Sequence, residues 1–98
     1  MKKLEPIHPG EILSEEFLLP LEISQSRLAE DTGISFEEVE KIIEGKAPIT
    51  PNAALRLSLF FGLSERFWLN LQSRYDLETE KDKVADRLQK EVRILQAA

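Results

Sequence analysis

The residues whose side chains could recognise another molecule gather on both sides of Gly33. They are Gln25, Arg27, Ser35, Phe36, Glu37, Glu40, Lys41 and Lys46. Ammonium and guanidinium groups contact phosphates, amide groups hydrogen-bond to base edges, and an aromatic ring can touch a thymine methyl group. A carboxylate accepts a hydrogen bond from the N4 amino group of cytosine. These residue types therefore indicate contact with nucleic acid.

Two short helices would place these side chains on one surface. The first spans 25–32, and the second spans 36–44 after Ser35, a good N-cap residue. The apolar positions of the pair recur at helical spacing: Leu28, Ala29, Thr32, Phe36, Val39, Ile42 and Ile43. Because Gly33 allows a tight turn, the two helices must cross steeply. This arrangement is the helix-turn-helix, which offers its second helix to the major groove of DNA.

The distribution of charge argues against a simple DNA-binding surface. The chain carries a net charge of −5, and residues 1–50 hold five bases against eleven acids, a net charge of −6. Residues 51–98 hold eight bases against seven acids. Phosphate contacts dominate affinity for DNA and normally require a basic surface. The half that contains the helix-turn-helix is instead the acidic half.

Two interpretations of the acidic second helix stay open. Ser35 and Glu38 have the spacing of a capping box, which would explain one carboxylate. Glu40 and Glu44 are like charges four residues apart, which does not stabilise a helix. Either this helix reads bases in an unusual way, or DNA binding is weakened. The first option needs cations to offset the carboxylates: Lys2, Lys3, Arg27, Lys46 and Arg56.

Several of these residues also have an ordinary structural interpretation. Lys41 is a better candidate for a phosphate than for a base. Lys46 is either a phosphate clamp or a solvated lysine, and Gln25 is either a DNA contact or an exposed polar residue. Phe36 could touch a thymine methyl group or pack against the core.

A first helix is expected before this pair. Residues 1–8 look like an extended arm, because Pro6 and Pro9 disfavour a helix there. Pro9 suits the first turn of a helix that runs to about Leu19. His8 is the single histidine of a chain without cysteine, so a zinc site of the usual type is excluded. We expect His8 to be a capping or loop residue.

Three more helices are expected after the pair. The first follows the N-cap residue Thr50 and ends at Gly62, and apolar residues nearly circle it, so it is either central or shared with a partner. The second spans 65–77 after the N-cap residue Ser64. Thr79 resembles the start of a sixth helix. Its narrow apolar stripe favours a helix–helix contact: Val84, Leu88, Val92 and Leu95.

Length and composition exclude several classes of protein. The chain has 98 residues, of which 42% are hydrophobic, and this suits one small domain with a core. No apolar run approaches the roughly 18–20 residues that span a bilayer, and no signal peptide is recognisable, so we expect a cytoplasmic protein without a membrane contact. We find no nucleophile–base pair, metal cluster or phosphate-binding glycine loop. No enzymatic activity, cofactor or metal is therefore expected.

Five segments of the chain follow a pattern known from one family. They are IHPGEIL at 7–13, EEFLLPL at 15–21, SQSRLAEDTGIS at 24–35, EGKAPITPNAALRL at 44–57 and FWLNLQSRYDL at 67–77. Together they resemble the HigA-type antitoxins, also called VapI-like proteins, of the Xre/Cro helix-turn-helix superfamily. The resemblance implies an all-α, five-helix Xre/Cro-like helix-turn-helix domain with its N-terminal arm over 1–77. Residues 78–98 carry little of the family pattern, and the extra C-terminal helix expected there rests on its apolar spacing and on Thr79 alone.

The resemblance also implies a function. Members of this family bind their own operator DNA as dimers, and they neutralise a HigB/RelE-like toxin that cuts mRNA on the ribosome. They usually carry a serine and an arginine early in the second helix of the pair, where this chain has glutamates. An alternative of a different class is therefore a protein-binding antitoxin module that blocks a basic toxin and barely binds DNA.

Overall fold

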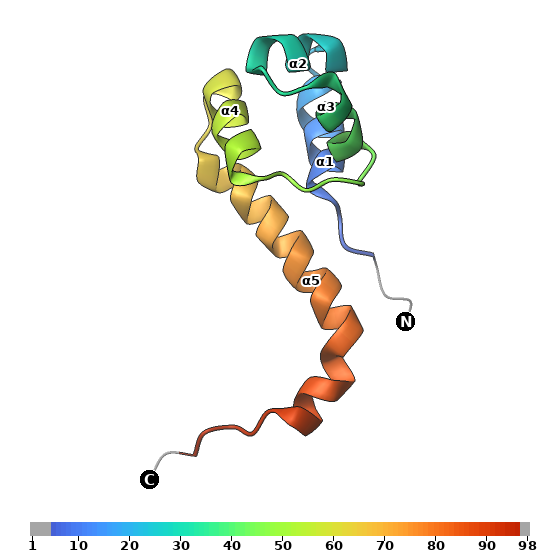
Figure 1. Cartoon of the computed structure of the whole chain (residues 1–98), viewed down its shortest axis with the longest axis vertical. Helices are drawn as coiled ribbons and strands as arrows, with labels where there is room; N and C mark the ends of the chain where they lie inside the picture. Colours follow the sequence, from blue (N-terminus) through green and yellow to red (C-terminus); the bar gives the residue numbers. More distant parts are fainter. Residues whose placement is uncertain (1–4, 97–98) are drawn as a thin grey trace.

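The computed structural model describes residues 5–96, and within this range the chain folds into helices joined by short connections (Figure 1). The helices are α1 (Pro9–Ile12), which continues directly as the π-helix η1 (Leu13–Leu18), α2 (Gln25–Thr32), α3 (Phe36–Ile43), α4 (Pro51–Phe61) and α5 (Glu65–Glu91). The predicted all-α class with five helices is confirmed. Residues 1–4, which include Lys2 and Lys3, lie outside the described residues.

Side-chain caps and glycines determine where the helices begin and end. Five residues accept a hydrogen bond from a backbone N–H group of the first helical turn: His8, Ser24, Ser35, Thr50 and Ser64. His8 does so through Nδ1, at 2.9 Å from the Gly10 nitrogen, which confirms its predicted capping role. Gly33 and Gly62 take left-handed φ angles of 77° and 76° and end α2 and α4.

The core lies where α1, η1 and α2–α4 meet the first turns of α5. Its buried apolar residues are Leu13, Leu18, Leu28, Ile34, Val39, Ile42, Ile49, Ala53, Ala54, Leu57 and Trp68. The Trp68 side chain is fully buried, and its ring lies 5.0 Å from the ring of Phe17 and 5.7 Å from that of Phe61. Aromatic pairs of this kind add stability beyond the area they bury. The base of α5 is therefore fixed to the rest of the domain.

The last helix is continuous where two helices were expected. The predicted start of a sixth helix at Thr79 is wrong, because α5 runs without interruption from Glu65 to Glu91. A threonine caps a helix only where the backbone leaves the helical conformation, and residues 76–82 contain no glycine or proline that would cause this. The predicted domain boundary between residues 77 and 78 falls inside α5.

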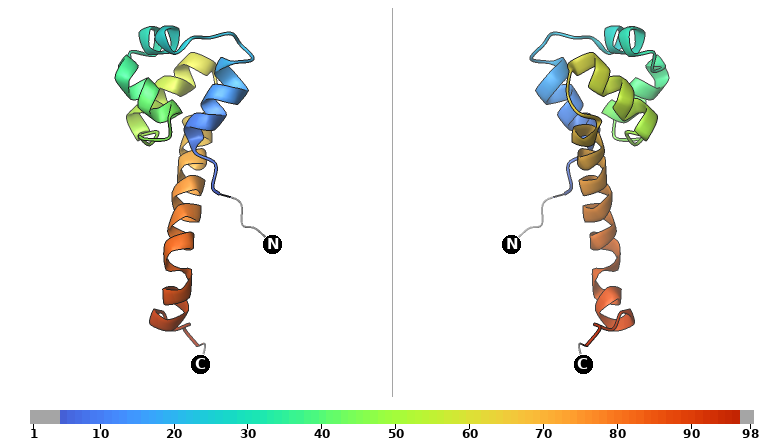
Figure 2. Two further views of the ribbon diagram at one scale, coloured as in Figure 1. Left: turned by 90° about the vertical axis from the view of Figure 1, so that its right-hand side faces the viewer. Right: turned by 90° about the vertical axis from the view of Figure 1, so that its left-hand side faces the viewer.

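The second half of α5 projects away from the body of the molecule, as Figures 1 and 2 show. No described residue beyond Gln72 is buried. The radius of gyration is 16.9 Å, against about 13 Å for a compact chain of this length. Val92 and Leu95, predicted to belong to a helical stripe, lie beyond the end of α5 and are exposed. Within the described range, no helix combines the length and apolar character that a bilayer-spanning segment needs.

Candidate nucleic-acid interface

The turn between α2 and α3 is held by hydrogen bonds that Thr32 organises. The Thr32 hydroxyl donates to the Leu28 carbonyl oxygen at 2.6 Å and accepts from the Ile34 N–H at 3.2 Å. Arg56 of α4 donates from Nη1 to the Thr32 carbonyl oxygen at 3.0 Å. Because this carbonyl belongs to the last turn of α2, the arginine satisfies an otherwise unpaired helix end. The predicted helix-turn-helix therefore forms, and α4 supports its turn.

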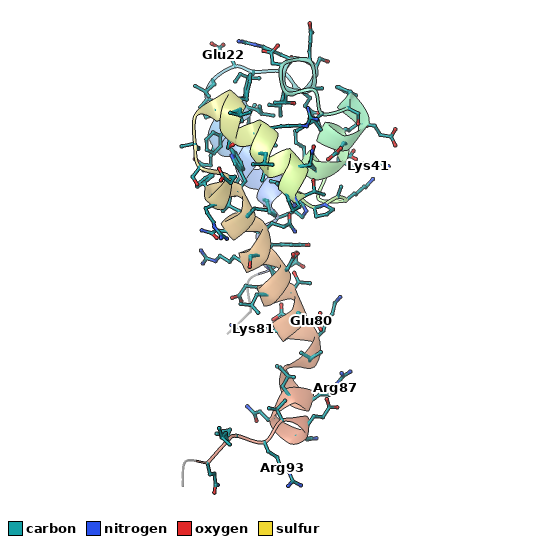
Figure 3. The ribbon with its side chains drawn as sticks, turned by 60° about the vertical axis from the view of Figure 1, so that its left-hand side comes forward. Glu22, Lys41, Glu80, Lys81, Arg87 and Arg93 are labelled. Carbon is teal, nitrogen blue, oxygen red and sulfur yellow. The ribbon has the colours of Figure 1, made fainter. Side chains whose placement is uncertain are left out.

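The two sides of α3 differ sharply in burial. Val39 and Ile42 are each 1% exposed and belong to the core. The opposite side is exposed to solvent along the helix and at its C-cap, and its residues are Phe36, Glu37, Glu40, Lys41 and Glu44. We call these five residues the outward face of α3. Figure 3 shows Lys41 at the edge of the body, well away from the projecting half of α5 that carries Glu80 and Arg87.

The eight residues predicted to contact nucleic acid all lie on α2, on α3 or directly beside them. Gln25 is half-buried at the start of α2, and the other seven are exposed. Ser35 accepts a hydrogen bond from the Glu38 N–H at 3.1 Å, but among the described residues the Glu38 carboxylate does not accept from the Ser35 N–H in return, so the capping box that would explain this carboxylate is incomplete. Phe36 is not packed into the core, since 46% of its surface stays exposed. Contact of these residues with DNA remains a prediction.

Each cation of the predicted set forms an ion pair with a carboxylate of the same surface. The pairs are Arg27 with Asp31 at 3.3 Å, Lys41 with Glu37 at 2.9 Å and Lys46 with Glu44 at 3.7 Å. The hydrogen bond and charge of Lys41 lower the pKa of Glu37, and those of Glu37 raise the pKa of Lys41. Exposed pairs are weak and exchange partners readily. A phosphate would therefore have to compete with an internal carboxylate for each cation.

Arg56 supports the helix-turn-helix through hydrogen bonds to two neutral oxygens, and an effect of its charge on the carboxylates of α3 stays a prediction. Besides its bond to Thr32, it donates from Nε to the Asn52 carboxamide oxygen at 2.8 Å. Both bonds hold the guanidinium group against α2 and α4. The sequence could not show this, because the partner is a backbone carbonyl 24 positions away.

Gln72 of α5 is a structural residue that the sequence reasoning missed. Its side chain is buried, with Oε1 accepting from the Ile49 N–H at 2.7 Å and Nε2 donating to Asp76 at 2.8 Å. The bond to Ile49 ties down the loop that follows α3. The available signal was a glutamine four residues after Trp68, in the register of a buried helical stripe. A polar residue in such a position is buried only when it has partners.

Among residues 5–96, no group of three or more histidine, aspartate and glutamate side chains is arranged to hold a metal ion. What the domain presents instead is a helix with an exposed polar face that follows a tight turn. A recognition helix in a helix-turn-helix has this form, with its first turns directed at base edges.

Comparison with known proteins supports the helix-turn-helix fold. The helix-turn-helix family matches residues 15–68. The chain is 42% identical over 82 residues to Virulence-associated protein I of Dichelobacter nodosus, which covers 83% of this chain and 76% of that protein. It is 37% identical over 75 residues to Antitoxin HigA-1 of Vibrio cholerae, covering 76% of this chain and 70% of that protein.

A solved structure agrees over almost the entire fold. Pseudomonas aeruginosa antitoxin HigA, solved with the higBA promoter, superimposes with a TM-score of 0.90 and 38% sequence identity. The match covers 94% of this chain and 100% of that one. The chain therefore belongs to the HigA-type, VapI-like antitoxins of the Xre/Cro helix-turn-helix superfamily.

Proposed function

We propose that this protein is a cytoplasmic autorepressor and antitoxin, which binds its own operator DNA as a homodimer and neutralises a HigB/RelE-like toxin that cuts mRNA. The observation that carries the proposal is that the outward face of α3 is exposed to solvent along the helix. It follows the turn between α2 and α3, which a hydrogen bond from Arg56 supports. A relative with the same fold and 38% identity was solved with promoter DNA, which supports DNA binding by this chain.

DNA binding would use the start of α3 for bases and the neighbouring residues for phosphates. Ser35 and Phe36 stand at the N-terminal end of α3, where recognition helices contact base edges. Lys41 and Lys46 lie near the other end and would exchange their carboxylate partners for phosphates. Two copies would place their α3 helices about 34 Å apart, one turn of B-DNA.

Dimerisation would use the apolar side chains that α4 leaves exposed. Leu55 and Leu59 lie four residues apart on one side of α4, and Leu59 is 86% exposed. Leu63 and Phe67, which follow along the chain, are further exposed apolar residues. A symmetric contact through such a surface would bury it in both copies at once. Leu59→Glu should then yield monomers in light scattering, whereas Leu88→Glu on the projecting half of α5 should leave the dimer intact.

The test of DNA binding is a gel shift with the duplex directly upstream of the protein's own gene. The wild type should form a complex whose affinity falls steeply as salt rises, because bound cations release counterions from DNA. Lys41→Ala and Lys46→Ala should each weaken binding and reduce the salt slope by about 1. Lys83→Ala, on the projecting half of α5, is the matched control. A wild type that forms no salt-sensitive complex at low salt would contradict the proposal.

The ion pairs of the same surface favour a second candidate function. With Arg27, Lys41 and Lys46 all paired to carboxylates, the surface would attract a basic protein more readily than DNA. The protein would then block a basic toxin directly and bind DNA weakly. Co-expression with the product of the adjacent gene tests this candidate. Co-purification without any DNA complex would support it, and tight DNA binding without a co-purifying protein would exclude it.

A further inference from the structure

We infer that Glu40 reads a cytosine in the major groove, so that the operator carries a cytosine under the centre of α3. The inference depends on the DNA binding proposed above and adds to it the identity of one base. It rests on two differences between the three carboxylates of the outward face, which are their partners and their positions around α3. It rests also on which bases a carboxylate can recognise.

Two of the three carboxylates on the outward face are already engaged. Glu37 accepts from the Lys41 ammonium group at 2.9 Å, and Glu44 lies 3.7 Å from that of Lys46. Glu40 is exposed and forms no side-chain hydrogen bond or ion pair with any residue between 5 and 96. Its oxygens are thus available to a ligand without the loss of an internal contact.

Glu40 also occupies the middle of the outward face. At 3.6 residues per turn it lies about 200° around the helix from Ile42, whose side chain is 99% buried in the core. Phe36 and Glu44 stand one turn before and one turn after it on the same side. A helix that enters a groove with its core side outward brings this central position nearest the floor of the groove.

The chemistry of a carboxylate limits what it can read there. Ionised glutamate only accepts hydrogen bonds, so it needs an amino group in the major groove. Cytosine offers its N4 amino group beside an uncharged C5–H edge, whereas adenine places the N7 acceptor next to its N6 amino group. Adenine would therefore repel the second carboxylate oxygen, and guanine and thymine would present only acceptors. Cytosine is the base that satisfies Glu40.

Selection of binding sites from a random duplex library tests the inference on the full-length protein. The wild type should enrich sequences with one fixed cytosine in each half-site. Glu40→Gln should replace that cytosine by adenine, because glutamine donates to N7 and accepts from N6 of adenine. On single duplexes, the wild type should prefer cytosine over adenine at this position about 5- to 150-fold, the range for one good base contact. The variant should reverse that preference.

Glu44→Gln is the matched control, because it makes the same change on the same face one turn away. Its selected sequences should keep the cytosine. The inference is wrong if Glu40→Gln leaves the selected base unchanged, or if Glu44→Gln is the variant that changes it. If the wild type enriches no sequence at all, the proposed DNA binding fails together with the inference, which is a different result from an unchanged motif.

Discussion

Gly10 of α1 lies so close to Ile42 of α3 that no side chain fits between them. A Cβ atom on Gly10 would overlap the Ile42 carbonyl oxygen and lie 2.6 Å from its carbonyl carbon. Both obstructing atoms belong to the backbone, which cannot move aside as a flexible side chain can. The contact therefore fixes the distance between α1 and the last turn of α3. The HPGEIL segment, which contains Gly10, therefore helps to determine the position of α3 and of its outward face.

Gly10→Ala should destabilise the protein through this contact. Overpacking in a well-filled site costs about 1–3 kcal/mol, and a clash with backbone belongs at the upper end of that range. Urea unfolding, followed by circular dichroism, measures the loss. Glu16→Ala is the control, since it places alanine at an exposed position of η1 and should change stability by less than about 0.5 kcal/mol. Equal stabilities of the two variants would show that α1 can move away from α3.

Gln72→Leu should destabilise the loop that follows α3. The substitution keeps the apolar packing of α5 but leaves the buried Ile49 N–H without an acceptor, which costs about 1–3 kcal/mol. Amide exchange at Ile49 should accelerate more than the global loss of stability explains. Gln89→Leu makes the same change at an exposed position of α5 and should have little effect. A Gln72→Leu protein as stable as Gln89→Leu would show that water replaces the glutamine.

His8 should make the stability depend on pH near neutrality. Burial lowers the pKa of His8 below its ordinary value of 6.5, although a backbone hydrogen bond to Ala47 and the charge of Asp76 oppose the shift. The neutral imidazole is the form that accepts from the Gly10 N–H at Nδ1. The unfolded chain then binds the proton more readily than the folded one. The contribution of His8 to the free energy of unfolding is therefore fully present above the pKa that His8 has in the unfolded chain. This contribution declines as the pH falls below that pKa.

His8→Asn isolates this effect, because asparagine also caps a helix but does not titrate in this range. Unfolding free energies measured from about pH 7.5 to about pH 5.5 should fall more in the wild type than in the variant. The difference in unfolding free energy between the wild type and the variant should stop changing once the pH lies below the pKa of His8 in the folded protein. A wild type that gains stability relative to the variant as the pH falls would contradict the direction of the shift.

Signals from residues close together in the sequence were sufficient to predict much of this fold. They were insufficient where contacts between distant parts of the chain determine the structure. The caps at Ser35, Thr50 and Ser64 and the turn at Gly33 are local, because each depends on residues within a few positions. The continuity of α5 through Thr79 was misjudged, since a capping residue looks the same whether or not the helix breaks.

The candidate site, too, has features that the local sequence predicts and others that it does not. That α3 would carry an exposed acidic face follows from its period, but which of its carboxylates are paired depends on side-chain conformations that a sequence does not record. The backbone groups that Arg56 and Gln72 contact, at Thr32 and Ile49, lie more than twenty positions away along the chain. No periodicity connects such pairs. Their roles became visible only once the helices were packed together.

Arg56→Ala should reduce stability without reducing DNA affinity. The loss of the bond to the Thr32 carbonyl leaves the end of α2 unsatisfied, and such a bond contributes about 0.5–1.5 kcal/mol. Arg66→Ala removes the same charge at an exposed position early in α5 and should be nearly neutral for folding. If Arg56 instead contacted phosphates, its loss would weaken the complex and lower the salt slope by about 1. Gel shifts corrected for the folded fraction therefore separate a residue that supports the helix-turn-helix from one that touches DNA.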